Sequence, residues 1–159
     1  MPVFGSPFSG LASKKKLTDE ELIRAIRFMV AAVDLLESPD FSTVDVIIPV
    51  PLHPGKYKKR GYNQSEWIGK GLSEILGKPQ DTTTLKRIKE NTTQTKKSVF
   101  ERFENTEGIF ECSNTETLTG MHVLLVDDVL TTGSTLEACI NALLKTEGIK
   151  VSVFTIAVA

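Results

Sequence analysis

The chain has 159 residues, a length that favours one domain and allows a core without disulfides or structural metals. Apolar residues make up 40% of the sequence and charged residues 25%, which are ordinary values for a soluble globular protein. The net charge is −1, so no global field draws the molecule toward nucleic acid or a membrane. Any basic binding site must therefore be local.

The cysteines and the hydropathy pattern argue against further classes of protein. Cys112 and Cys139 are the only cysteines, too few for a disulfide framework or a four-cysteine zinc site. We expect both to act as small, mostly buried hydrophobes. No stretch is apolar and long enough to cross a bilayer, and the N-terminus lacks the apolar region of a signal peptide. The sequence therefore predicts a cytoplasmic protein without membrane contact.

The first part of the chain, residues 1–43, is expected to form an arm and a helix that pack on a domain spanning 44–159. Thr18 and Glu21 have the spacing of a capping box, which marks a helix start. Apolar residues then follow at helical spacing, namely Leu22, Ile26, Met29, Val33 and Leu36. The segment "SPD" ends this helix.

From residue 44 onward, strand and helix patterns alternate. Strands are expected at 44–50, 83–88, 108–112, 122–128 and 151–159, and helices at 63–76 and 134–147. The core face of the last helix is expected to hold Leu136, Cys139, Ile140, Leu143 and Leu144. Polar sequence predicts a basic loop between the first strand and residue 63, and an exposed, mobile segment at 89–106. This order predicts a three-layer α/β domain with a mostly parallel sheet.

The stretch "VLLVDDVLTTGST" (residues 123–135) carries the most specific chemistry. Asp127 and Asp128 repel each other, so we expect hydroxyl donors or a metal ion to stabilise their adjacent negative charges. Ligands of open parallel sheets bind beyond the carboxyl ends of the strands, where we expect this pair. The following loop leads into a helix whose first amides attract anions. A phosphate site beside an acid pair that binds hydroxyls fits a ribose 5-phosphate.

This stretch resembles the phosphoribosyl pyrophosphate (PRPP) binding motif of type I phosphoribosyltransferases. The resemblance implies the type I phosphoribosyltransferase fold, with Asp127 and Asp128 on the ribose hydroxyls. It implies a 5-phosphate loop made of Thr131, Thr132, Gly133, Ser134 and Thr135. Adjacent acids also end strands of receiver domains and P-loop ATPases, but "GSPFSGLA" lacks the lysine and hydroxyl of a P-loop.

A second run, "IIPVPLHPGKYKKRGYNQS", resembles the ComF family, phosphoribosyltransferase-like proteins associated with natural competence and DNA uptake. Further matches to that family's pattern are Leu85, Arg87, Gln94, Arg102, Asn105, Gly108 and Phe110. The resemblance implies partners among competence proteins, such as a DNA-uptake helicase. ComF proteins commonly begin with a cysteine-rich zinc module, and with two cysteines we expect no zinc here.

The family resemblance also implies roles for the middle of the chain. Pro51, Leu52 and His53, with Lys59 and Arg60, are expected to hold the pyrophosphate. His53 either assists there or is a packing and turn residue. The segment 89–106 is expected to close over the site. Its Gln94 and Arg102 would reach phosphate oxygens, whereas Lys96 and Lys97 either do the same or belong to a solvated surface loop.

Together these features predict Mg²⁺-dependent transfer of phosphoribose from PRPP to an unidentified nitrogen acceptor, a nucleobase or an amine, with release of pyrophosphate. Asp127 and Asp128 are the expected catalytic residues, and no residue is assigned as a direct metal ligand. Two alternatives stay open: a PRPP-binding or interaction module without catalysis, and a single-strand DNA contact through "KYKKRGYN". A homodimer is also open, because related folds often dimerise. Tyr57, Tyr62 and Trp67 receive no site assignment.

Overall fold

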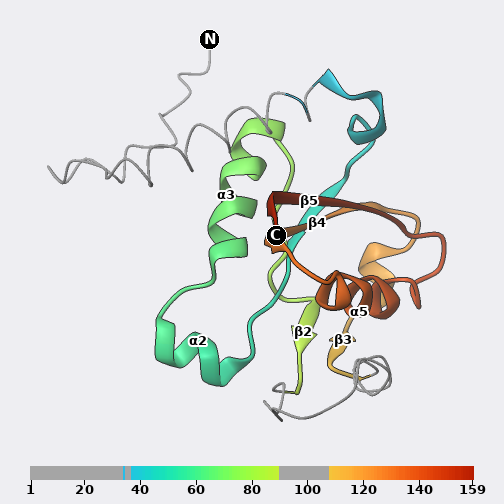
Figure 1. Ribbon diagram of the computed structural model, residues 1–159. Coiled ribbons are helices and arrows are strands. Elements are labelled where there is room, and N and C mark those ends of the chain that lie inside the picture. Colours follow the sequence, from blue (N-terminus) through green and yellow to red (C-terminus); the bar gives the residue numbers. More distant parts are fainter. Residues whose placement is uncertain (1–33, 35–36, 90–107) are drawn as a thin grey trace, which may run out of the picture.

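The computed structural model describes residues 34, 37–89 and 108–159 (Figure 1). The expected helix from Thr18 lies outside these ranges, as do Gln94 and Arg102 of the expected closing segment. In chain order the described elements are η2 (Pro39–Phe41), β1 (Val46–Pro49), α2 (Pro54–Arg60), α3 (Gln64–Leu76), β2 (Leu85–Arg87), β3 (Phe110–Cys112), η3 (Thr115–Leu118), β4 (His122–Leu130), α5 (Ser134–Leu143) and β5 (Lys150–Val158).

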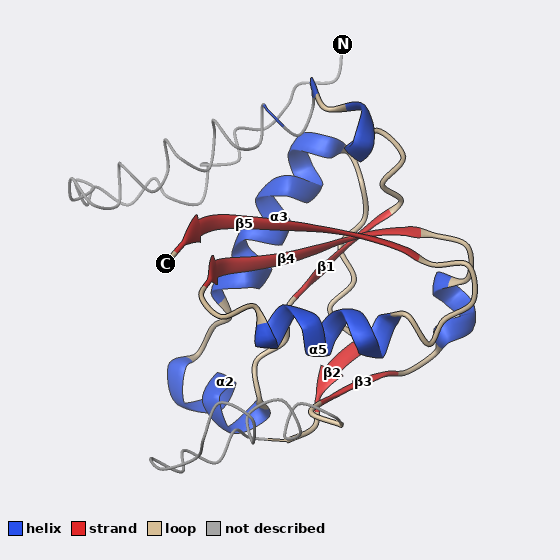
Figure 2. Cartoon of the chain, turned by 45° about the vertical axis from the view of Figure 1, so that its right-hand side comes forward, coloured by secondary structure: helices blue, strands red, loops and turns tan. Residues whose placement is uncertain are grey.

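The main sheet has the order β1-β4-β5, and both neighbouring pairs are parallel. Parallel neighbours need crossover connections, which the helices between these strands supply. The prediction of an α/β domain with a mostly parallel sheet is therefore confirmed. Strands β2 and β3 form a separate antiparallel pair below α5 (Figure 2).

Strand β1 and the first part of β4 are buried on both faces, which explains their unbroken apolar runs, whereas the edge strand β5 is mostly half-buried. Alternate residues of β4 face opposite sides: Val123 and Leu125 belong to one core cluster, Leu124 and Val126 to another. The first cluster includes α5 residues such as Leu136, Cys139 and Leu143; the second includes Leu72 of α3. The expected three-layer arrangement is thus present, with α3 and α5 on opposite faces of the sheet (Figure 2).

Three expectations about local structure were wrong. The loop after β1 contains the short helix α2, because Pro54 fits a first helical turn, His53 caps it and Gly61 ends it with φ +81°. Helix α5 ends at Leu143, so Leu144 is 55% exposed instead of part of the core face. Strand β4 continues beyond Asp128 because Leu130 still pairs with β5.

Both cysteine side chains are shielded from water to some degree, Cys139 fully and Cys112 in part. Burial raises the pKa of each thiol, so both stay protonated near neutral pH. This agrees with the expectation that they pack as small hydrophobes. Among the described residues, no helix has the length and apolar character needed to span a bilayer.

Candidate functional site

The acid pair lies just beyond the point where β1 stops pairing with β4. The pairing between β1 and β4 ends at Pro49 and Val126, followed by a hydrogen bond from the Val50 amide to the Val126 carbonyl, 2.8 Å long. Beyond this point β4 is paired with β5 alone, in a register that joins Asp127 to Thr155. The acids therefore lie beyond the carboxyl end of β1, the position at which such sheets bind ligands.

Local hydrogen bonds fix the two carboxylates differently. Asp127 Oδ1 accepts from the Ser65 hydroxyl at 3.0 Å and from the amide of Asp128 at 2.9 Å. Asp128 Oδ1 accepts from the amide of Val129 at 2.8 Å. Each carboxylate is thus held by the amide of the residue that follows it, and the two lie close enough for the charge of Asp128 to act on Asp127. Sequence reasoning missed Ser65, whose contact with Asp127 joins residues far apart in the chain.

The environment of Asp127 opposes its negative charge. Burial is the main cause and raises the pKa of this carboxyl above its ordinary value, and the neighbouring charge of Asp128 raises it further. The hydrogen bonds from the Asp128 amide and the Ser65 hydroxyl act in the opposite direction without cancelling the rise. A ligand that brings hydroxyl donors would stabilise the ionised form. The site is therefore suited to a polyhydroxylated ligand.

The loop after β4 has the backbone of an anion site. Gly133 caps helix α5 with φ +78°, in the left-handed region that favours glycine. The hydroxyls of Thr132 and Ser134 are 3.0 Å apart, so they lie together at the start of the helix. The first amides of α5 have no acceptor within the helix and carry its positive dipole end. The five loop residues expected to hold a phosphate are thus grouped at a helix N-terminus, half-exposed or exposed.

The segment between β1 and α3 is anchored by a buried asparagine. Asn63 is 2% exposed, donates from Nδ2 to the Val50 carbonyl at 2.9 Å and accepts from the Ser65 amide at 3.1 Å. It therefore ties the end of β1 to the first turn of α3. That turn carries Ser65, which in turn contacts Asp127. Asn63 is a positioning residue that sequence reasoning identified only as a helix start.

The expected pyrophosphate residues divide into two groups. Pro51, Leu52 and His53 begin one residue after the end of β1 and are half-buried. The His53 ring accepts from the Gly55 amide at 3.2 Å, so it caps α2 and has the turn role that was one of its two alternatives. Lys59 and Arg60 are exposed in the last turn of α2, and Arg60 donates to Gln64 at 2.6 Å.

Few side chains at the candidate site could bind a metal ion. No group of three or more His, Cys, Asp or Glu side chains gathers anywhere in residues 34, 37–89 and 108–159. Mg²⁺ is commonly held by one or two carboxylates together with substrate phosphates and water. Asp127 and Asp128 could supply such carboxylates, so the residues present fit a magnesium ion held mainly by its substrate.

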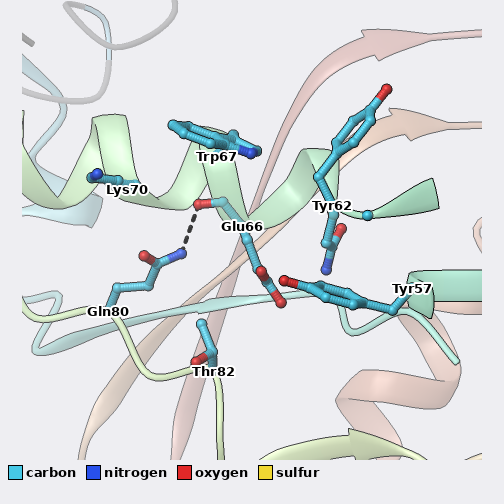
Figure 3. A pocket seen from close by; sticks show the side chains of 9 residues that line it. Tyr57, Tyr62, Glu66, Trp67, Lys70, Gln80 and Thr82 are labelled. Atoms are coloured by element: carbon cyan, nitrogen blue, oxygen red, sulfur yellow. Dashed lines mark hydrogen bonds between the residues drawn. The ribbon is translucent and has the colours of Figure 1, made fainter. Parts of the chain in front are cut away.

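A cavity of ≈ 300 Å³ lies beside the first two turns of α3 (Figure 3). Its lining comes from α2, α3 and the segment after α3, and includes Tyr57, Tyr62, Glu66, Trp67, Lys70, Gln80 and Thr82. Neither acid of the β4 pair and no residue of the loop 131–135 lines it. The cavity is therefore distinct from the acid pair and the loop, although Asn63, which positions Ser65, also lines it.

Comparison with known proteins defines the class of this domain. Residues 63–159 match the phosphoribosyl transferase domain, so the chain belongs to that family. A purine phosphoribosyltransferase from Pyrococcus horikoshii has the same fold, with a TM-score of 0.51 and 22% identity over 82% of this chain and 73% of that chain. The predicted type I phosphoribosyltransferase fold is confirmed.

Curated relatives narrow the family. Competence protein F of Haemophilus influenzae is 34% identical over 122 residues, which are 76% of this chain and 53% of the relative. DNA utilization protein YhgH of Salmonella typhimurium is 30% identical over 151 residues, 93% of this chain and 66% of the relative. The chain thus spans between about half and two-thirds of the length of these relatives. The predicted relation to the competence-associated ComF group is confirmed.

Proposed function

We propose that this protein binds PRPP and transfers its phosphoribose to a nitrogen acceptor, a nucleobase or an amine, with release of pyrophosphate. The observation that carries the proposal is the acid pair of β4 followed directly by a glycine-containing hydroxyl loop at the start of α5. Family membership supports it, because the matched range contains both features.

In this proposal the loop 131–135 binds the 5-phosphate through backbone amides and hydroxyls. The 2- and 3-hydroxyls of the ribose then donate to Asp127 and Asp128. Since burial raises the pKa of Asp127, these donors stabilise a carboxylate that the protein alone holds poorly. The bound ribose is oriented from both ends, which is the main way a protein accelerates a transfer that needs little covalent help.

Mg²⁺ is the proposed cofactor, and Asp127 and Asp128 are the residues that would help to hold it together with the substrate. When bound, it supplies positive charge that offsets the charge of the departing pyrophosphate. Pro51, Leu52 and His53 lie after β1, and we assign the backbone of this segment to the pyrophosphate. Lys59 and Arg60 of α2 add positive charge nearby in sequence. Gln94 and Arg102, which lie outside the described residues, remain the proposed contacts of a closing segment.

The test of this proposal is calorimetric titration of PRPP, with Mg²⁺, into a double variant, Asp127→Asn and Asp128→Asn. We expect binding to be lost while the circular dichroism spectrum is unchanged, because Asn is isosteric but lacks the carboxylate charge. The matched control replaces two exposed acids far from the site, Glu111→Gln and Glu116→Gln, and should bind PRPP like the parent. Unchanged affinity in the Asn double variant would refute the assignment.

A second candidate function is PRPP binding without catalysis, in a competence complex. The names of the relatives support a role in DNA handling, and helix α2 offers four cations without an acidic residue. We therefore propose contacts with single-stranded DNA and with competence proteins such as a DNA-uptake helicase. Pyrophosphate release with any nucleobase or amine would exclude the non-catalytic role. A salt-dependent gel shift tests the DNA contact, since phosphate contacts weaken with salt.

We also propose that the protein works in the cytoplasm, where PRPP is available, and as a homodimer. Light scattering during gel filtration tests the second point. A mass equal to that of one chain at micromolar concentration would exclude the dimer.

A further inference from the structure

All three tyrosine and tryptophan side chains of this protein line the same cavity. The sequence contains two tyrosines and one tryptophan, and Tyr57, Tyr62 and Trp67 all contribute to the lining. They remain 43%, 46% and 64% exposed, respectively. Leaving these large side chains in water forgoes burial that would stabilise the fold. Their gathering from α2, α3 and the turn between these helices suits a ligand with a flat ring.

The polar groups around this cavity are both acidic and basic. Figure 3 shows Trp67 facing Gln80 and Thr82 across the cavity, with the Tyr57 hydroxyl pointing toward Glu66. Gln80 donates from Nε2 to the Glu66 carbonyl at 2.8 Å, which fixes that wall. The Glu66 carboxylate can accept from an amino group. A planar ligand would therefore meet aromatic faces and a hydrogen-bond acceptor in one place.

Positive charge borders the same cavity. The Lys70 ammonium lies 5.4 Å from the centre of the Trp67 ring, within the range of a cation–π contact. Helix α2, which supplies Tyr57, has the sequence PGKYKKR, with three exposed lysines and an arginine. None of these α2 cations lines the cavity, so Lys70 is the cation beside a ring stacked on Trp67.

This cavity does not share its side chains with the acid pair. Ser65 points to β4 and donates to Asp127, whereas Glu66, Trp67 and Lys70 line the cavity. Residues one position apart on a helix point in different directions, so these side chains of α3 point away from the acid pair, and Asn63, which also lines the cavity, lies between the two. A ligand in the cavity does not need PRPP to be bound.

We propose that this cavity binds the base of a nucleotide, stacked on Trp67 with its amino group toward Glu66 and its phosphate toward Lys70. Its volume, ≈ 300 Å³, is at the lower end of the range for small-molecule sites, about 300–1,000 Å³. The base belongs either to a free nucleotide or to a single strand. Both present the same ring and phosphate, and both stack on aromatic side chains without strong sequence preference.

The protein carries its own reporter for this proposal, because Trp67 is its only tryptophan. We would titrate the parent protein with dCMP and dTMP, and separately with short oligodeoxycytidylate and oligodeoxythymidylate, while following tryptophan fluorescence. Saturable quenching by the mononucleotides assigns the site to free nucleotides. Quenching by the oligonucleotides alone assigns it to a single strand. No saturable quenching by any of the four probes overturns the proposal.

Calorimetric affinities of Trp67 variants show whether the base stacks on Trp67 or binds elsewhere and quenches its fluorescence from a distance. Trp67→Ala should weaken binding of the effective probe by about 5- to 140-fold, the range for loss of one stacked base. Trp67→Phe should retain much of the affinity. Ile88→Ala removes another side chain that is 48% exposed but lies outside the cavity, and should change nothing. Equal affinity of the parent and Trp67→Ala would overturn the proposal.

Two further measurements test the orientation of the base and whether the cavity binds it independently of PRPP. Glu66→Ala should reduce the preference for cytosine over thymine, because thymine has no amino group to donate. An unaltered preference would overturn the assigned orientation of the base. PRPP titration of Trp67→Ala should match the parent. Failure of PRPP binding in every variant and in the parent would reject the phosphoribosyl proposal and leave the base site standing.

Discussion

Replacing Asn63 by alanine should destabilise the protein through two separate losses. The amide donor to the Val50 carbonyl disappears, and so does the cap that accepts from the Ser65 amide. A buried carbonyl without a partner costs about 1–3 kcal/mol, and loss of a helix N-cap about 1 kcal/mol. The free energy of unfolding should therefore fall by about 2–4 kcal/mol. This is a large part of the 5–15 kcal/mol typical of a domain.

Urea unfolding of the parent, Asn63→Ala and Asn63→Ser measures these two losses separately. Serine keeps the cap but cannot reach the Val50 carbonyl, so this variant should be more stable than the alanine variant by about 1 kcal/mol. With an m-value of about 2 kcal/mol/M, the middle of the usual range, the midpoint of Asn63→Ala should shift by roughly 1–2 M. A loss below about 1 kcal/mol in Asn63→Ala would refute the anchoring role. Equal loss in both variants would refute the contribution of the cap.

Three further predictions concern pH, the loop backbone and the loop hydroxyls. Burial, and then the charge of Lys150, lowers the pKa of His122 below its ordinary 6.5. The unfolded state therefore binds a proton more readily than the folded state. The free energy of unfolding should fall as the pH drops below about 6.5. Urea unfolding at about pH 7 and about pH 5.5 should show this fall, and His122→Gln should reduce it. An equal change in the free energy of unfolding between the two pH values in the variant would contradict the role of His122. Gly133→Ala should cost about 1–2 kcal/mol of stability because of its φ of +78° and should also weaken PRPP binding, whereas Gly77→Ala, at φ +65° away from the site, should lose stability alone. Thr132→Val should weaken PRPP binding by about 1–3 kcal/mol in a calorimetric titration, and unchanged affinity would contradict a hydroxyl contact with the phosphate.

Local sequence patterns predicted the parts of the fold that depend on short-range physics. Unbroken apolar runs predicted buried strands, and β4 is indeed covered on both faces. Asn63 and Gly77 predicted the ends of α3 because capping depends on residues next to the helix. The position of the loop 131–135 before helix α5 was predicted for the same reason, since Gly133 and Ser134 mark a helix start locally.

Other features depend on contacts that no local pattern contains. Helix α2 has no buried residue, so it lacks the apolar stripe that would have predicted it, although Pro54 and Gly61 are typical helix ends. The hydrogen bond between Ser65 and Asp127 joins positions 62 residues apart, as tertiary packing brings α3 to β4. The cavity formed by the three aromatic residues also depends on how α2 and α3 meet, which their spacing in the sequence does not reveal.

The central claim is that the acid pair and the hydroxyl loop form a phosphoribose site. The most direct test is calorimetric titration of the parent protein with PRPP, once with Mg²⁺ and once with a chelator. The account predicts saturable binding with one PRPP per chain that is clearly tighter when Mg²⁺ is present. Absence of binding under both conditions would contradict it.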